Sequence, residues 1–297
     1  MGYPTPSRSQ IFELDEYDRF DLQKNEDGEE EEPKILVSDF SWDSCNVHMS
    51  DYLDIIKKYS RLFRSIPFVK HIYLCNSITF NALNPESDID ILIITNHKKI
   101  RLARFFSILL FTIFGVRNHA KPYFNTDVDA VGELELESSH TKRQKFCLSF
   151  YVDEKYLNFY KILLQPIDIY FIYWLAHLVP LYTNDRLRIN HIRKHNRRLK
   201  NYLPNHDLDQ EIQIWNDLII GNNKFKDIVE WIFGGLFGGF INKMIKYLWM
   251  PILSFKLKKL WPKKGWGVVI SDRMLKFHVD MRKLYLVRYT NRLKRKT

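Results

Sequence analysis

Hydrophobic positions along the chain follow two different periods, and each period predicts a different element. Apolar side chains recur three or four residues apart over 50–63 and fill much of 98–115, a pattern typical of helices. Shorter runs rich in branched and aromatic side chains, at 68–76, 88–95 and 145–152, indicate strands. We interpret this mixture of helices and strands as an α+β fold, with a sheet flanked by helices.

The second half of the sequence is predicted to be mainly helical. Residues 167–182 form an apolar run that favours a buried helix, and helical spacing resumes from about residue 208. Two glycine pairs within 234–239 interrupt this spacing and predict helix breaks or close packing. The chain is therefore expected to divide into a core domain at 50–165 and a helical, basic C-terminal region at 166–297.

Charge is distributed unevenly along the chain, whose formal net charge is +10. Residues 1–34 hold eleven acidic side chains against four basic ones, which predicts a disordered acidic arm. Residues 241–297 hold sixteen Lys and Arg against two Asp, and 187–202 hold six Lys and Arg with two His. These basic segments favour a polyanionic partner: nucleic acid, a membrane surface or the chain's own acidic arm. The alternative is a solvated surface on a basic protein.

Three apolar stretches are candidates for a helix that crosses a membrane. They lie at 105–116, 169–184 and 231–242 and are 12 to 16 residues long, whereas a spanning helix needs roughly 20 apolar residues. We expect core helices, with contact to a membrane surface as the alternative at 228–260, where tryptophans mix with lysines. The three cysteines lack metal-binding spacing and the N-terminus is polar, which favours reduced thiols and a cytoplasmic location.

Two aspartates, Asp88 and Asp90, stand at the start of the apolar run 88–95. Side chains alternate along a strand, so both carboxylates are expected on one face. Two ionised carboxylates so close repel each other, and a divalent cation removes that repulsion. Mg²⁺ takes hard oxygen ligands and commonly links one or two carboxylates to phosphates. The alternative is that Asp88 caps the preceding turn and Asp90 faces solvent.

The segment 68–95 resembles the DNA polymerase β-like nucleotidyltransferase superfamily. The resemblance rests on a strand that ends in Asn76-Ser77, followed by "ESDIDILIIT". The stretches "KFCLSFYV", "WLAHLVPLY", "YLPN" and "SDRMLKFHVDMR" are also similar to a group of bacterial nucleotidyltransferase-domain proteins.

The resemblance implies a nucleotidyltransferase-like mixed sheet, in which Asp88 and Asp90 bind Mg²⁺ and act in catalysis. Asn76 and Ser77 would hold the nucleotide phosphates. The implied reaction is Mg²⁺-dependent transfer of a nucleoside monophosphate from an NTP to an acceptor, by positioning and charge neutralisation.

Two departures from the family pattern affect this expectation. Asn76 stands where the family usually has Gly. The run 145–152 has no acid, and strict alternation puts Lys145, Cys147, Ser149 and Tyr151 on one face. The sequence-near candidate for a third catalytic carboxylate is Asp153. Without such a group, the alternatives are a catalytically inactive nucleotide- or nucleic-acid-binding protein, or a peripheral membrane-associated protein.

Overall fold

The computed structural model describes residues 49–75, 78–79, 87–118, 145–163, 169–188, 190–197, 219–235, 237–248 and 269–277. The predicted acidic arm 1–34 and the candidate phosphate-binding residues Asn76 and Ser77 lie outside these segments. The remaining candidate site residues, Asp88, Asp90 and Asp153, are all described.

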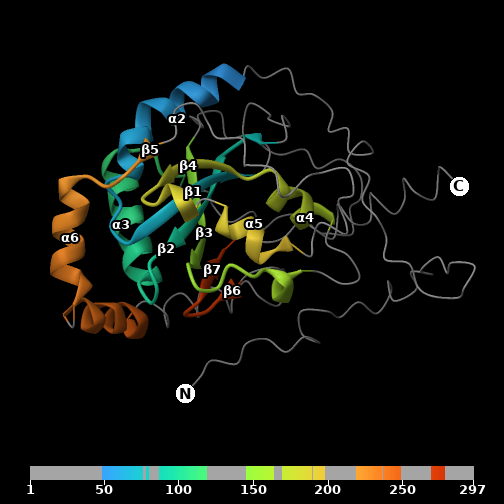
Figure 1. Ribbon diagram of the computed structural model, residues 1–297. Helices are drawn as coiled ribbons and strands as arrows, with labels where there is room; N and C mark the ends of the chain where they lie inside the picture. Colours follow the sequence, from blue (N-terminus) through green and yellow to red (C-terminus); the bar gives the residue numbers. More distant parts are fainter. Residues whose placement is uncertain are drawn as a thin grey trace, which may run out of the picture.

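Within the described residues, seven strands form one mixed sheet in the order β5-β4-β1-β2-β3-β7-β6 (Figure 1). The strands are β1 Val69–Cys75, β2 Ile89–Thr95, β3 Phe146–Asp153, β4 Val179–Thr183, β5 Ile219–Ile220, β6 Val269–Ile270 and β7 Met274–Lys276. Two pairs are parallel, β2 with β3 and β4 with β5, and the other neighbours are antiparallel. Parallel neighbours need a long crossover, and the helix α3 (Ile100–Ile113) lies in the one that joins β2 to β3.

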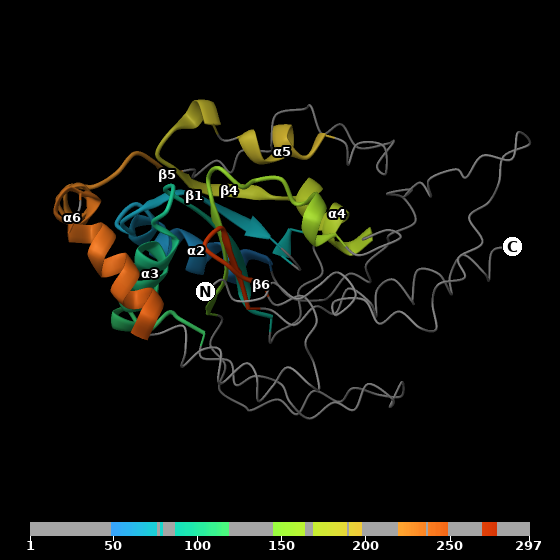
Figure 2. The same ribbon diagram turned by 90° about the horizontal axis from the view of Figure 1, so that it is seen from below.

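Helices cover both faces of the central strands. The other elements are α2 Met49–Phe63, α4 Ile169–Ala176, α5 His191–His195, α6 Lys224–Gly234, the helix Phe237–Leu248 and two 3-10 turns, η3 Tyr160–Ile162 and η4 Arg186–Arg188. Figure 2 shows α2 and α3 on one side of the sheet and α5 on the other. Because both faces are covered, β1 and β2 read as nearly continuous apolar runs rather than as alternating ones.

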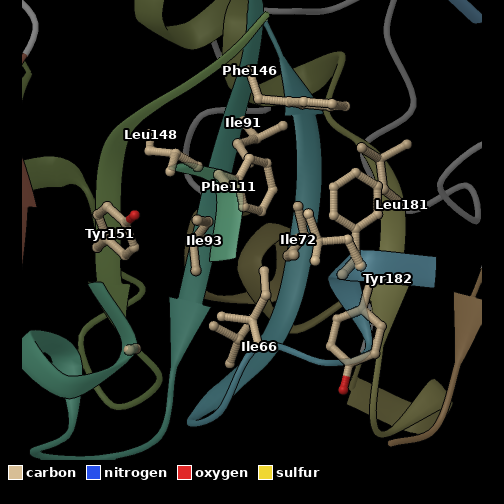
Figure 3. Close-up of a cluster of buried hydrophobic side chains, with 14 of the residues drawn as sticks. Ile66, Ile72, Ile91, Ile93, Phe111, Phe146, Leu148, Tyr151, Leu181 and Tyr182 are labelled. Carbon is tan, nitrogen blue, oxygen red and sulfur yellow. The ribbon is translucent and has the colours of Figure 1, made fainter. Parts of the chain in front are cut away.

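Each face of the sheet carries its own apolar cluster. Ile91 and Ile93 of β2 pack with Phe111 of α3 and Phe146 of β3 in the cluster of Figure 3. Leu92, from the opposite face of β2, packs in the second cluster with residues of β3 and α4. The sequence prediction of an α+β fold with a mixed sheet flanked by helices is confirmed at this level.

A bulge in the pairing of β2 with β3 changes which side chains of β3 share a face. The register runs from Asp90 opposite Cys147 to Leu92 opposite Phe150, so β3 carries one extra residue there. After the bulge, Tyr151 joins the cluster of Phe146, whereas Phe150 joins the opposite one. The expectation that Tyr151 shares a face with Cys147, and Phe150 one with Phe146, is therefore wrong, because strict alternation fails across a bulge.

Residues 166–297 do not form a purely helical region. Strands β4, β5, β6 and β7 all belong to this part of the chain and extend the same sheet on both sides. The predicted helix 167–182 ends at Ala176 and is followed by β4, which contains Pro180. Pro180 pairs with Tyr73 where the register of β1 with β4 shifts, a place where a strand tolerates proline.

The two glycine pairs mark a helix break and a close packing contact, as predicted: Gly234-Gly235 stands at the end of α6, and Gly238-Gly239 lies in the first turn of the next helix. The axes of α6 and the helix Phe237–Leu248 are bent by 84°. A Cβ added to Gly238 would lie 1.6 Å from the carbonyl oxygen of Phe233, so the backbones approach too closely for a side chain. No single helix among the described residues is long and apolar enough to cross a membrane; this bent pair alone passes on length and composition.

Candidate functional site

Asp90 is the second residue of β2, and Asp88 directly precedes the strand. The alternation of β2 puts Asp90 on the face of Leu92, which packs with α4, while Ile89 and Ile91 pack on the face of α2 and α3. Both aspartates are half-buried. Side chains two residues apart on a strand lie roughly 6–7 Å apart, so one cation could contact both carboxylates.

The neighbours of Asp90 across the sheet are two cysteines. Cys75, the last residue of β1, pairs with Asp90 on one side, and Cys147 of β3 pairs with it on the other. The Cys75 thiol donates to the backbone carbonyl of Asp90 at 3.3 Å. Burial raises the pKa of the Cys75 thiol well above its ordinary value, and Asp90 and Cys147 raise it further. Asp90 therefore has a neutral thiol, rather than another carboxylate, on its β1 side.

Asn118 holds the carboxylate of Asp88. Its side-chain amide donates to Oδ2 of Asp88, and its backbone N–H donates to the carbonyl of Phe146 at 2.9 Å. Asn118 lies four residues after the C-cap of α3, where Arg117 bridges to β3. Asn118 was not expected from the sequence, because nothing in its local pattern distinguishes it from any polar residue after a helix.

Asp153 lies at the opposite end of the sheet from the aspartate pair. It pairs with Thr95, whereas Asp90 pairs with Cys147, so five residues of β2 separate the two levels. At about 3.3 Å per residue, this separation is on the order of 16 Å. The expectation that Asp153 lies in one cleft with Asp88 and Asp90 is therefore wrong. Parallel strands bring their C-terminal ends together, and Asp88 and Asp90 stand at the N-terminal end of β2.

The carboxylate of Asp153 instead holds the turn after β2. It is 1% exposed and accepts the backbone N–H of Lys98 at 2.7 Å and that of Lys155 at 3.0 Å. It also lies 3.1 Å from Nδ1 of His97. Lys98 has a φ of 60°, a conformation that non-glycine residues adopt rarely and that needs support from its surroundings. Asp153 supplies that support.

The neighbouring Glu154 extends this structural network. Its carboxylate accepts from Lys70 at 2.5 Å and from the backbone N–H of His97 at 3.1 Å. Burial alone would raise the pKa of Glu154, but the hydrogen bonds from Lys70 and His97 hold it below its ordinary value. Asp153 and Glu154, at the C-terminal end of β3, thus bind groups of the protein itself.

The basic segment 187–202 is partly structural. In its described part, Arg193 is buried and donates to the carbonyl of Ala176 at 2.8 Å, which ties α5 to the end of α4. Lys194 and His195 of the same helix are exposed. Not every basic side chain of this segment is therefore available to a polyanion.

The described residues contain no group of three or more His, Cys, Asp or Glu arranged to hold a metal ion. A cation at Asp88 and Asp90 would need further oxygen ligands from water or from a phosphate. No family model, curated protein or solved structure matches the chain. The function is therefore argued from the geometry and from the resemblance of the Asp-x-Asp segment.

Proposed function

We propose that this protein binds a nucleoside triphosphate together with Mg²⁺, and that Asp88 and Asp90 hold the ion. The observation that carries the proposal is the position of the two carboxylates. They stand side by side at the start of a strand that is otherwise buried, next to the end of β1. A solvated pair of aspartates needs no such location, whereas a metal platform needs carboxylates that are held in place.

The amide of Asn118 supports this interpretation. It donates to Oδ2 of Asp88 and fixes the position of that carboxylate. Mg²⁺ retains several waters and is usually shared between one or two carboxylates and substrate phosphates. A site with two protein carboxylates fits that preference. The Asp-x-Asp segment that resembles nucleotidyltransferases favours a nucleotide as the source of those phosphates.

Nucleotidyl transfer to an acceptor is the second candidate function. The paired carboxylates favour it, because bound Mg²⁺ would neutralise the phosphates during an in-line displacement. The neighbours of Asp90 argue against transfer. Asp90 stands between Cys75 and Cys147, and within the described segments no third carboxylate lies beside Asp88 and Asp90. Binding is therefore the function that the geometry supports best.

Isothermal titration calorimetry with each of the four NTPs tests the proposal, with Mg²⁺ present or chelated. We expect one NTP or more to bind in Mg²⁺ and to lose affinity at least about tenfold when the metal is removed, because carboxylates repel unneutralised phosphates. The variant Asp88→Asn, Asp90→Asn should abolish the metal-dependent part. The control Asp54→Asn, Asp227→Asn changes the charge equally at two exposed positions. Unchanged binding in the first variant would place the nucleotide elsewhere.

Incubation with α-phosphate-labelled NTP and candidate acceptors separates the two functions. Labelled product that requires Asp88 and Asp90 would establish transfer. Metal-dependent binding without labelled product, over the same screen of acceptors, would leave binding as the function.

A further inference from the structure

The two helices after β5 have apolar side chains on both sides. On their inner side, Val229 and Phe233 of α6, and Ile241 and Ile245 of the next helix, pack against the cluster of α2 and α3. On the outer side, large apolar side chains are exposed. This outer apolar face consists of Ile228, Trp231 and Ile232 of α6 and Phe237, Phe240 and Tyr247 of the helix Phe237–Leu248.

The side chains of the outer apolar face are well exposed. Trp231 is 84% exposed and Phe240 is 62% exposed. Spacings of three and four residues, from Ile228 to Trp231 and Ile232 and from Phe237 to Phe240, keep these side chains on one side of each helix. A contiguous set of this kind marks an interaction surface, whereas single exposed apolar residues do not.

The polar contacts of the two helices lie toward the body of the protein. Nζ of Lys99 donates to the carbonyls of Phe233 and Gly234, each at 3.0 Å, at the bend between the helices. The Asn242 amide donates to the carbonyl of Lys98 at 3.1 Å. Figures 1 and 2 show α6 beside α3 at one side of the molecule. The helices are thus held against α3 while their outer side stays apolar.

Charge in this part of the chain identifies the chemistry of the partner. Residues 224–271, which include both helices, contain nine lysines and two acidic residues, Asp227 and Glu230. Lys224 and Lys243, on the two helices themselves, are exposed. A second copy docked on the same face would bring these like charges together, which opposes self-association. An anionic lipid surface satisfies both features, because aromatic side chains enter the boundary between headgroups and acyl chains while lysines meet anionic headgroups.

We propose that the outer apolar face docks on an anionic lipid bilayer, with α6 and the helix Phe237–Leu248 lying in its surface. The two helices meet at an angle of 84° and Lys99 bonds to their junction, so they form an angled pair rather than one straight helix. This inference is independent of the nucleotide site, because it rests on different residues and a different partner.

Vesicle flotation with the full chain tests this proposal. We expect the protein to float with vesicles of phosphatidylcholine and phosphatidylserine and to float much less with phosphatidylcholine alone. Added salt should weaken association but leave a residual apolar part, because salt screens charge and not apolar burial. The variant Trp231→Glu, Phe240→Glu should lower partitioning at least about tenfold, since each buried aromatic contributes roughly a factor of ten or more.

Leu187→Glu provides a control, because Leu187 is an 89% exposed apolar residue of η4, an element outside the outer apolar face. It should float like the wild type. Circular dichroism should show both variants folded, as their side chains are exposed. A second measurement needs no disruptive change: brominated lipids should quench the wild type more than Trp231→Phe, which keeps the apolar ring but loses the indole.

Three results would overturn the proposal. One is failure to float with anionic vesicles, and another is flotation that Trp231→Glu, Phe240→Glu leaves unchanged. The third is a concentration-dependent dimer, lost in that variant and formed without any lipid association, which would assign the face to a second copy of the chain.

Discussion

The buried Lys226 should make the stability of the fold depend on alkaline pH. Its side chain, on the inner side of α6, is fully buried, and Nζ donates to the carbonyl of Val69 and, at 2.7 Å, to the hydroxyl of Tyr182. Nζ lies 3.8 Å from Glu230, whose carboxylate accepts the backbone N–H of Phe68 at 2.6 Å. These contacts attach α6 to β1 and β4. Burial lowers the pKa of Lys226 to about 8, although Glu230 and Asp227 act in the opposite direction.

The sign of the effect follows from proton counting. Below pH 8 the lysine is charged in both the folded and the unfolded chain. Between pH 8 and the ordinary lysine pKa of about 10.4, the folded chain has lost the proton while the unfolded chain keeps it. The unfolded state then binds more protons, so the free energy of unfolding rises with pH. With about 1.4 kcal/mol per pKa unit, Lys226 should add roughly 2 kcal/mol between pH 7 and pH 9.5.

Urea denaturation of the wild type and Lys226→Met at several pH values measures this contribution. Other groups also contribute in this range: the Cys75 thiol ionises at its ordinary pKa in the unfolded chain, whereas burial raises that pKa in the folded chain. The relevant quantity is therefore the difference in unfolding free energy between wild type and variant, which should increase by roughly 2 kcal/mol from pH 7 to pH 9.5. Lys224→Met, at an exposed position of the same helix, should leave the pH dependence of the wild type unchanged. A difference that stays flat or falls with pH would refute the reasoning.

Three further predictions concern single positions. Asp153→Ala should destabilise the fold by about 3 kcal/mol, because it leaves the N–H groups of Lys98 and Lys155 without their acceptor; calorimetry on the folded variant should show Mg²⁺-dependent nucleotide binding unchanged. Cys147→Asp places a carboxylate opposite Asp90 and should increase the rise in melting temperature that Mg²⁺ produces, whereas Cys147→Ser should not. Gly238→Ala should lower stability by roughly 1–3 kcal/mol in thermal denaturation, because its Cβ meets the Phe233 carbonyl. Gly239→Ala, where an added Cβ meets nothing within 4 Å, is its control.

The central elements could be predicted from the sequence because their apolar runs are long and lie between clear breaks. The runs at 68–76, 88–95 and 145–152 correspond to β1, β2 and β3, and 98–115 corresponds to α3. The strands after residue 166 could not, since they contain two to five residues and no periodic signal extends over so short a run. Their pairing is decided by the free edges of the sheet rather than by local propensity.

In the candidate site too, local features could be predicted from the sequence, whereas features that depend on strand pairing could not. That Asp88 and Asp90 begin a buried strand is a local property, and the sequence predicts it. Which residues stand beside them depends on strand direction and register. The helix between β2 and β3 already indicated parallel strands, and that direction alone places Asp153 at the far end from the pair. The register that sets Cys147 beside Asp90, and the bulge after it that turns Tyr151 to the other face, have no comparable signal in the sequence.

The direction of β2 also separates the two proposed surfaces. The aspartate pair stands at its N-terminal end, whereas Lys98 and Lys99, which bond to the two outer helices, follow its C-terminal end. Trp231 and Phe240 belong to other elements than Asn118, β1 and β3, which hold or flank Asp88 and Asp90. Effects at distant, independent sites are additive in general. Two described elements connect the surfaces. One is α3, because Asn118, four residues beyond its C-cap, holds Asp88. The other is β1, which carries both Val69, bonded to Lys226 of α6, and Cys75, bonded to Asp90. Nucleotide affinity that changes when the protein binds vesicles would therefore point to a displacement of α3 or β1.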